Sequence, residues 1–210
     1  MSDREATLLL TKIGFLYLKK MGCHTISTEI HIPIRDHYLT GKDSHYAIDL
    51  LGISKKYIPY KQQKEHKKLV YGDKEVDGGV IKFHNVLRGI EVKVSRGDFN
   101  NGFIHGGCHY NYLLVPKGLI KPSEVHSDIG IIEVDFEQLA VIHPKYVTMQ
   151  NQGFHLSGIQ IGRKPKRKQI DGWVVDRCFS QIGETLTNQA KRWLVETFNS
   201  QLKKEENVPH

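Results

Sequence analysis

The chain of 210 residues lacks the features that mark membrane-spanning, disulfide-bonded or zinc-ribbon proteins. It has no run of 18 or more apolar residues, which excludes a transmembrane helix, and we expect no membrane partner. Its three cysteines have no C-x-x-C spacing, so we expect reduced thiols. Asp3, Arg4 and Glu5 precede a short apolar stretch, unlike a secretory signal. We therefore expect a cytoplasmic protein, or one of the host cytoplasm if a phage encodes it.

The composition is that of a globular protein with a positive charge. Hydrophobic residues make up 39% and charged residues 25%, and the formal net charge is +7. Residues 55–74 contain seven lysines against two acids, and five of the six residues 163–168 are basic. This excess suits a polyanionic partner, although each segment alone is more often a solvated loop.

The spacing of apolar residues predicts an α/β fold with a small mixed sheet flanked by helices. A helix is expected over residues 3–21, where Ser2 and Glu5 match a capping box. In the strand at 25–32, alternation places Ile26 and Ile30 on one face and Glu29 on the other. The other expected strands are 46–51, 86–94, 110–115 and 129–134, with a short helix within 96–109 and an amphipathic helix at 183–203.

We expect the chain to consist of two parts. Residues 1–136 form the core, with a lysine-rich insertion at about 54–85. Residues 137–210 are a C-terminal extension that packs on the core and ends in the amphipathic helix. The apolar stripe of that helix either covers the sheet or forms a homodimer interface.

Two acidic positions on predicted strands are candidate metal ligands. In residues 89–95, GIEVKVS, alternation places Glu91 and Lys93 together on one face, opposite three β-branched residues. In residues 46–52, YAIDLLG, Asp49 interrupts an apolar strand, where an unpaired carboxylate is costly to bury. If these strands are neighbours, Asp49, Glu91 and the carbonyl of Val92 can hold one Mg²⁺ or Mn²⁺ ion. Glu29 is a further acid beside them. Alternatively, Glu91 and Lys93 form an ion pair on an exposed face of the sheet.

Asp49 followed by Glu91-Val92-Lys93, after a helix and a strand with an acid, resembles the PD-(D/E)xK nuclease superfamily. The likeness is greatest to bacterial DNA-repair proteins of the MmcB type, with Glu91, Lys93, Ser95, Asp98 and Phe99 matching one block and residues 110–116 a following strand. Holliday-junction resolvases share the looser pattern. The resemblance covers residues 3–136 and implies a restriction-endonuclease-like core.

The resemblance also implies an activity, namely divalent-metal-dependent hydrolysis of phosphodiester bonds in DNA, in repair, restriction or phage biology. Asp49, Glu91, Lys93 and Glu29 are its implied catalytic residues. Residues that flank the site or lie in the second basic run are candidates to bind nucleic acid: Arg88, Ser95, Arg96, Arg163, Lys164, Lys166, Arg167 and Lys168.

Several alternatives stay open from the sequence. A catalytically inactive nucleic-acid-binding module with the same fold is one, and a metal-free structural protein is another. His105, Cys108 and His109 suggest zinc, but a glycine pair between them favours a loop with incidental histidines. Trp173, Trp193 and Phe198 are interpreted as core aromatics, with base stacking as the alternative.

Overall fold

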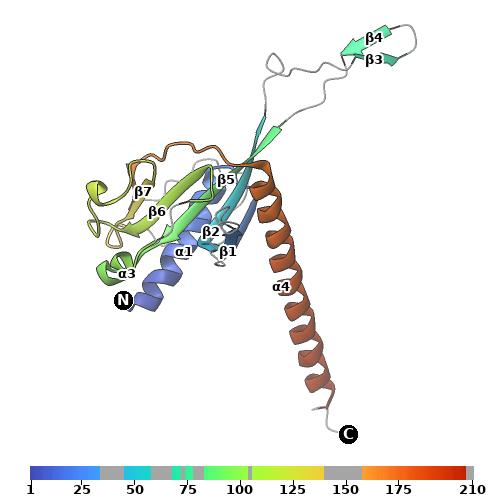
Figure 1. Cartoon of the computed structure of the whole chain (residues 1–210). Helices are drawn as coiled ribbons and strands as arrows, with labels where there is room; N and C mark the ends of the chain where they lie inside the picture. Colours follow the sequence, from blue (N-terminus) through green and yellow to red (C-terminus); the bar gives the residue numbers. More distant parts are fainter. Residues whose placement is uncertain are drawn as a thin grey trace.

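The computed structural model describes residues 1–33, 45–57, 68–71, 74–77, 83–103, 106–139 and 158–206. Its centre is a six-stranded sheet in the order β1-β2-β5-β6-β7-β8 (Figure 1). Strands β1, β2 and β5 are antiparallel neighbours, β5, β6 and β7 run parallel, and β8 is antiparallel to β7. The strands are β1 Thr25–Pro33, β2 His45–Tyr57, β5 Phe83–Val92, β6 Tyr110–Pro116, β7 Gly130–Val134 and β8 Ile159–Arg163. The prediction of an α/β fold with a small mixed sheet is confirmed.

The remaining elements are α1 (Asp3–Lys20), α3 (Arg96–Asn100), the 3₁₀ turn η2 (Pro122–Glu124) and α4 (Gly172–Glu206). A separate hairpin of β3 (Lys68–Tyr71) and β4 (Lys74–Asp77) lies in the expected insertion. The insertion is shorter than the predicted residues 54–85, because β2 continues to Tyr57 and β5 begins at Phe83. Strand β8, with the sequence IQIGR, was not predicted, because the alternation of Ile159, Gln160 and Ile161 is too short to single it out as a strand.

Helix α1 covers one face of the sheet. Ser2 caps it and Glu5 closes the capping box, as the sequence predicted. Its buried side chains join those of β2, β5, β6 and β7 in one core cluster. The helix approaches the sheet closely at Gly14, where a Cβ atom would lie 2.5 Å from Cδ1 of Leu50.

Two further clusters fill the opposite face. One lies under the start of α4, where Val174, Cys178 and Ile182 pack against side chains of β1, β2 and β5. The other joins β6 and β7 to Phe99 of α3 and to the loop residues that follow β6. Glu91 points to this face, because Ile90 and Val92 on either side of it belong to the α1 cluster.

Strands β1 and β2 change the direction of their side chains partway along. Ile26 packs with the α1 cluster, whereas Ile30 packs on the opposite face, so the prediction that they share a face is wrong. The cause is Glu29, whose φ of 54° lies in the left-handed region and breaks the alternation. In β2, Ile48 and Leu51 share a face although they are three residues apart. Both breaks occur at acidic positions or next to them.

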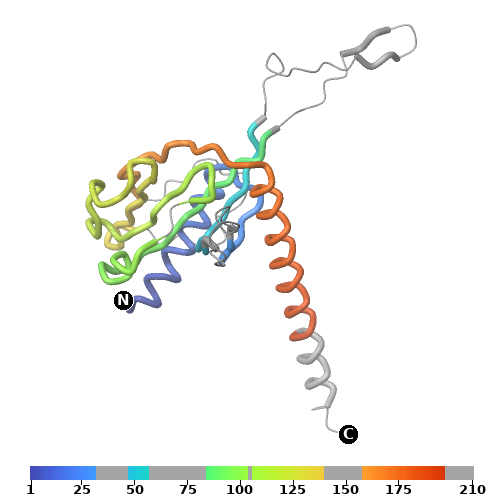
Figure 2. The backbone as a smooth tube through the Cα atoms, in the orientation of Figure 1, coloured from blue at the N-terminus to red at the C-terminus, as the bar shows by residue number. Residues whose placement is uncertain are grey.

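Helix α4 packs on the sheet through its first turns and then leads away from it (Figures 1 and 2). Trp173 and Trp193 are 43% and 63% exposed, so their interpretation as core aromatics is wrong; the side chain of Phe198 lies outside the described part. The homodimer expected through this helix stays a prediction. Within the described residues, no helix is apolar over a length that would span a bilayer.

The packing at Gly14 predicts different effects for the same substitution in two helices. Gly14→Val should lower the free energy of unfolding by about 1–3 kcal/mol, because its branched side chain overpacks the core at Leu50. Gly183→Val in α4 meets no atom within 4 Å and should be neutral or slightly stabilising. Urea unfolding measures both changes. Equal effects at the two positions would argue against close packing of α1 on the sheet.

Candidate active site

The strand register brings three acidic residues into one row. Glu29 of β1 lies at the position opposite Asp49, between the pairs Thr28↔Leu50 and Ile30↔Ile48. The pairing of β2 with β5 starts at Leu50↔Ile90, so the next position along places Asp49 opposite Glu91. The strands of Asp49 and Glu91 are therefore neighbours, which is the condition for a shared ion.

Asp49 is tied to β5 through the backbone. The amide of Val92 donates a hydrogen bond to Oδ2 of Asp49 at 2.7 Å. The carboxylate of Asp49 therefore accepts a hydrogen bond from a β5 amide just beyond the pair Leu50↔Ile90, where the pairing of β2 with β5 ends. This bond fixes the carboxylate of Asp49 beside the end of β5, where Glu91 and Lys93 also lie.

Lys93 links the acids of β5 and α3. Its ammonium lies 3.5 Å from Oε1 of Glu91 and 3.3 Å from Oδ1 of Asp98, and its side chain is only 11% exposed. The backbone amide of Lys93 donates to the carbonyl of Leu114, which anchors the residue to β6. The ammonium is therefore held at the junction of the carboxylates and largely shielded from water.

Burial shifts both strand carboxylates toward the protonated form. Burial raises the pKa of Glu91 to about 7, the nearby Asp49 carboxylate adds to the shift, and Lys93 opposes it. The pKa of Asp49 is also raised, chiefly by burial, with Glu29 among the like charges that contribute. Both shifts have the same origin, because carboxylates taken out of water next to one another resist ionisation.

The residues fit a divalent cation. Three carboxylates, those of Asp49, Glu91 and Asp98, act on the single ammonium of Lys93. Oε2 of Glu91 is buried without a hydrogen-bond partner in the described structure, so one oxygen is left for a ligand. Within the described ranges, no three His, Cys, Asp or Glu side chains group as a metal site. The donors would be Asp49, Glu91 and the carbonyl of Val92 with waters, a sparse oxygen set that Mg²⁺ accepts.

Asp98 is the residue whose role the sequence reasoning missed. Its Oδ2 accepts from the amide of Val94 at 3.1 Å, and Ser95 caps α3 by accepting from the amide of Asp98. The spacing Ser-x-x-Asp is a signal for a helix start that would have placed Asp98 one turn into a helix beside Lys93. Ser95, a candidate phosphate contact, thus serves as the N-cap.

The two arginines expected to flank the site have other partners. Arg88 shares the α1 face of the sheet with Ile90, where its guanidinium donates to Ser54 and lies 5.2 Å from the ring centre of Tyr110. That is the face opposite Glu91. Arg96 forms an ion pair with Glu124 and donates to the carbonyl of Leu119, holding the loop after β6 against α3. The structure therefore brings neither guanidinium to the carboxylates of Asp49 and Glu91.

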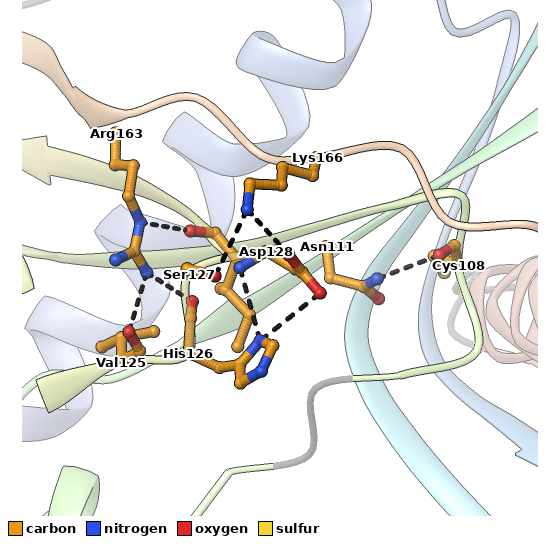
Figure 3. Close-up of polar contacts among 9 residues, drawn as sticks. Cys108, Asn111, Val125, His126, Ser127, Asp128, Arg163 and Lys166 are labelled. Atoms are coloured by element: carbon orange, nitrogen blue, oxygen red, sulfur yellow. Dashed lines mark hydrogen bonds and ion pairs between the residues drawn. The ribbon is translucent and has the colours of Figure 1, made fainter.

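Arg163, at the end of β8, donates from Nε and Nη2 to backbone carbonyls of the loop before β7 (Figure 3). It donates to the carbonyl oxygens of Pro122, Val125, His126 and Ile129 at 2.6–3.1 Å. Four carbonyls of one loop thereby gain a donor from a single side chain. The expected nucleic-acid contact is replaced by this clamp, which fixes the loop between β6 and β7.

The rest of the second basic run divides into two groups. Lys166 lies 3.5 Å from Oδ1 of Asp128 (Figure 3), and Lys164 is exposed. Arg167 and Lys168 precede the start of α4 and lie near His109, away from the carboxylates of Asp49 and Glu91. Of the alternative zinc residues, His105 lies outside the described part, Cys108 is buried in the cluster under α4, and His109 accepts a backbone hydrogen bond.

Comparisons with known proteins do not show a family for this chain. No family model matches it, and no curated protein matches it. Among solved structures, the chain is similar to the SPO1766 protein of unknown function from Silicibacter pomeroyi, with 14% identity and a TM-score of 0.32. The match covers 75% of this chain and 84% of that chain. At this level the likeness carries no argument, so the function is argued from the residues.

The contacts of Arg163 predict a structural role. Arg163→Met should lower the free energy of unfolding by about 1–3 kcal/mol, because several carbonyls lose their donor. Lys164→Met, the exposed neighbour, should change it by less than about 0.5 kcal/mol. Urea unfolding compares the two. Wild-type stability of Arg163→Met together with weaker DNA binding would return Arg163 to the nucleic-acid interface.

The raised pKa of Glu91 predicts a pH-dependent effect of Glu91→Gln. Because the folded-state pKa of about 7 exceeds the ordinary value of 4.5, the carboxyl group stabilises the fold below that ordinary value. This contribution is lost as the pH rises to about 7. In EDTA, the unfolding free energy of the wild type minus that of the variant should fall across this window and then level off. Urea unfolding across the window measures the difference, and a constant difference would refute the shift.

Proposed function

We propose that the chain is a divalent-metal-dependent nuclease that hydrolyses phosphodiester bonds in DNA. The observation that carries this proposal is the position of Asp49, Glu91 and Lys93 together at the end of β5, with one buried oxygen of Glu91 unsatisfied. The likeness to the PD-(D/E)xK superfamily, with its restriction-endonuclease-like core, rests on these same residues. The order of helix, three antiparallel strands, short helix and parallel strand supports that core.

The carboxylates provide a reason to bind a cation. Asp49 and Glu91 are both half-buried and repel each other, and Lys93 alone does not return their pKa values to the ordinary range. A divalent ion held by the two carboxylates and the Val92 carbonyl would favour their ionised forms. When bound, Mg²⁺ or Mn²⁺ supplies Lewis-acid polarisation of the scissile phosphate.

The position of Lys93 supports a role at the scissile phosphate. Its ammonium is largely shielded from solvent, and Glu91 and Asp98 hold it from two sides. A charge fixed in a water-poor site stabilises developing negative charge more than the same charge in water. Lys93 would donate a hydrogen bond to a phosphate oxygen, while Asp98 orients the ammonium.

The assignment predicts distinct losses for substitutions of the acids and the lysine. Asp49→Ala and Glu91→Ala should abolish Mg²⁺- or Mn²⁺-dependent cleavage of plasmid and single-stranded DNA. Lys93→Ala should slow cleavage by about 10²–10³-fold, the usual effect of removing one such donor, with DNA affinity unchanged. Lys93→Arg should rescue poorly, since a planar guanidinium does not replace a compact ammonium. Gel-based assays with Mg²⁺ or Mn²⁺ measure cleavage, and gel shifts in EDTA measure DNA affinity.

The control is Lys117→Ala. Lys117 also pairs with a carboxylate, that of Asp135 at 2.8 Å, but it is exposed and follows a different strand. It should cleave as the wild type does. If Lys93→Ala and Glu91→Ala keep full cleavage, the catalytic assignment is wrong. If the wild type binds DNA in EDTA but never cleaves it with either metal, the chain is instead an inactive binding module.

A further inference from the structure

A second concave site lies at the other end of β5. Four segments line a cavity of about 630 Å³, within the range of small-molecule sites. They are the first residues of β5, the residue before β6, the segment 164–171 and the first turns of α4. Asn85 in this lining is six residues from Glu91, about 20 Å along an extended strand, so the cavity is separate from the carboxylates. The lining includes His84, Asn85, His109, Arg167, Lys168 and Gly172.

Positive charge gathers in this cavity. The segment 164–171 crosses the end of the sheet from β8 to α4 (Figure 2), and the amide of Lys168 donates to the carbonyl of His109 at 2.8 Å. Arg167 and Lys168 therefore lie beside the start of β5. Arg163 and Lys166 of the same run are engaged with protein acceptors. In the part of the chain that the structure describes, no carboxylate pairs with Arg167 or Lys168, and Asp176 adds one acid to the lining.

His109 offers the cavity a neutral hydrogen-bond donor. The amide of Leu87 donates to Nδ1 of His109 at 3.1 Å, so the proton of the neutral ring resides on Nε2. Burial lowers the pKa of His109, and Arg167 acts in the same direction. The ring is therefore neutral at physiological pH, with Nε2–H as its donor.

Two further features indicate a ligand with both an anionic and a polar part. Oδ1 of Asn85 is buried without a hydrogen-bond partner in the described structure, so it can accept from an N–H or O–H group. A rotation of the amide by 180° would place its NH₂ group there instead. Gly172 begins α4, and the amides of a helix N-terminus favour an anion.

We propose that this cavity binds a phosphate group of a nucleotide through Arg167, Lys168 and His109, with Asn85 contacting the rest of the ligand. The phosphate belongs either to a DNA strand or to a free mononucleotide, because both present the same group. The inference does not depend on cleavage at Asp49 and Glu91. It is tested in EDTA, where cleavage does not occur, so its failure is distinguishable from that of the nuclease proposal.

The test compares two double variants that remove equal charge from the same basic run. Arg167→Gln with Lys168→Gln empties the cavity of its cations, and Lys164→Gln with Lys166→Gln is the matched control outside it. The probes are deoxyadenosine monophosphate, measured by calorimetry, and a labelled single-stranded oligonucleotide, measured by fluorescence anisotropy. Melting curves should show that both double variants fold. Arg167→Glu, which reverses the charge at one cavity residue, serves as a second cavity variant.

The cavity variant should lose about tenfold or more in affinity for at least one probe, with less than about threefold loss in the control. A selective loss for the oligonucleotide, with the salt slope of log K reduced by about 1.4 for two single-strand phosphates, assigns the cavity to the strand. A selective loss for the monophosphate assigns it to a free nucleotide. Equal losses in the two double variants for both probes, or no loss in either, would overturn the proposal.

Discussion

Asp49 and Glu91 lie half-buried opposite each other on neighbouring strands, and Lys93 is the cation that acts on both. Carboxylates in that position are unfavourable without compensation, and the structure compensates them only in part. The Val92 amide satisfies one oxygen of Asp49, while Oε2 of Glu91 remains without a partner in the described structure. The proposed divalent cation would relieve this shortage of positive charge.

The sheet around these residues is built to hold them in place. Glu29 adopts a left-handed φ, and the side chains of β1 and β2 change face at the row of acids. Such a break costs backbone energy, which the two core clusters on either side of the sheet offset. Helix α3, capped by Ser95, then directs Asp98 back onto Lys93. The acids come from β1, β2, β5 and α3, so the site exists only when these elements are assembled.

Much of this arrangement could be predicted from local patterns. The capping box of α1, the face shared by Glu91 and Lys93, and the apolar strands all depend on short-range spacing. Features that depend on tertiary contacts could not be predicted. Arg163 lies in a basic run typical of a phosphate contact but binds four backbone carbonyls. Helix α4 has an apolar stripe, yet Trp193 in it is exposed. The left-handed Glu29 carries no sequence signal, since glycine or asparagine is the usual residue there.

The central claim is that Asp49 and Glu91 form a site for one divalent ion, and binding of Mn²⁺ tests it most directly. Calorimetric titration of the whole chain at about pH 7.5, above the raised pKa of Glu91, should show one ion per chain. Asp49→Asn and Glu91→Gln keep the shape of each side chain but remove its charge, and each should abolish this binding. Absence of Mn²⁺ binding by the wild type, or an affinity equal to that of the wild type in both variants, would contradict the account.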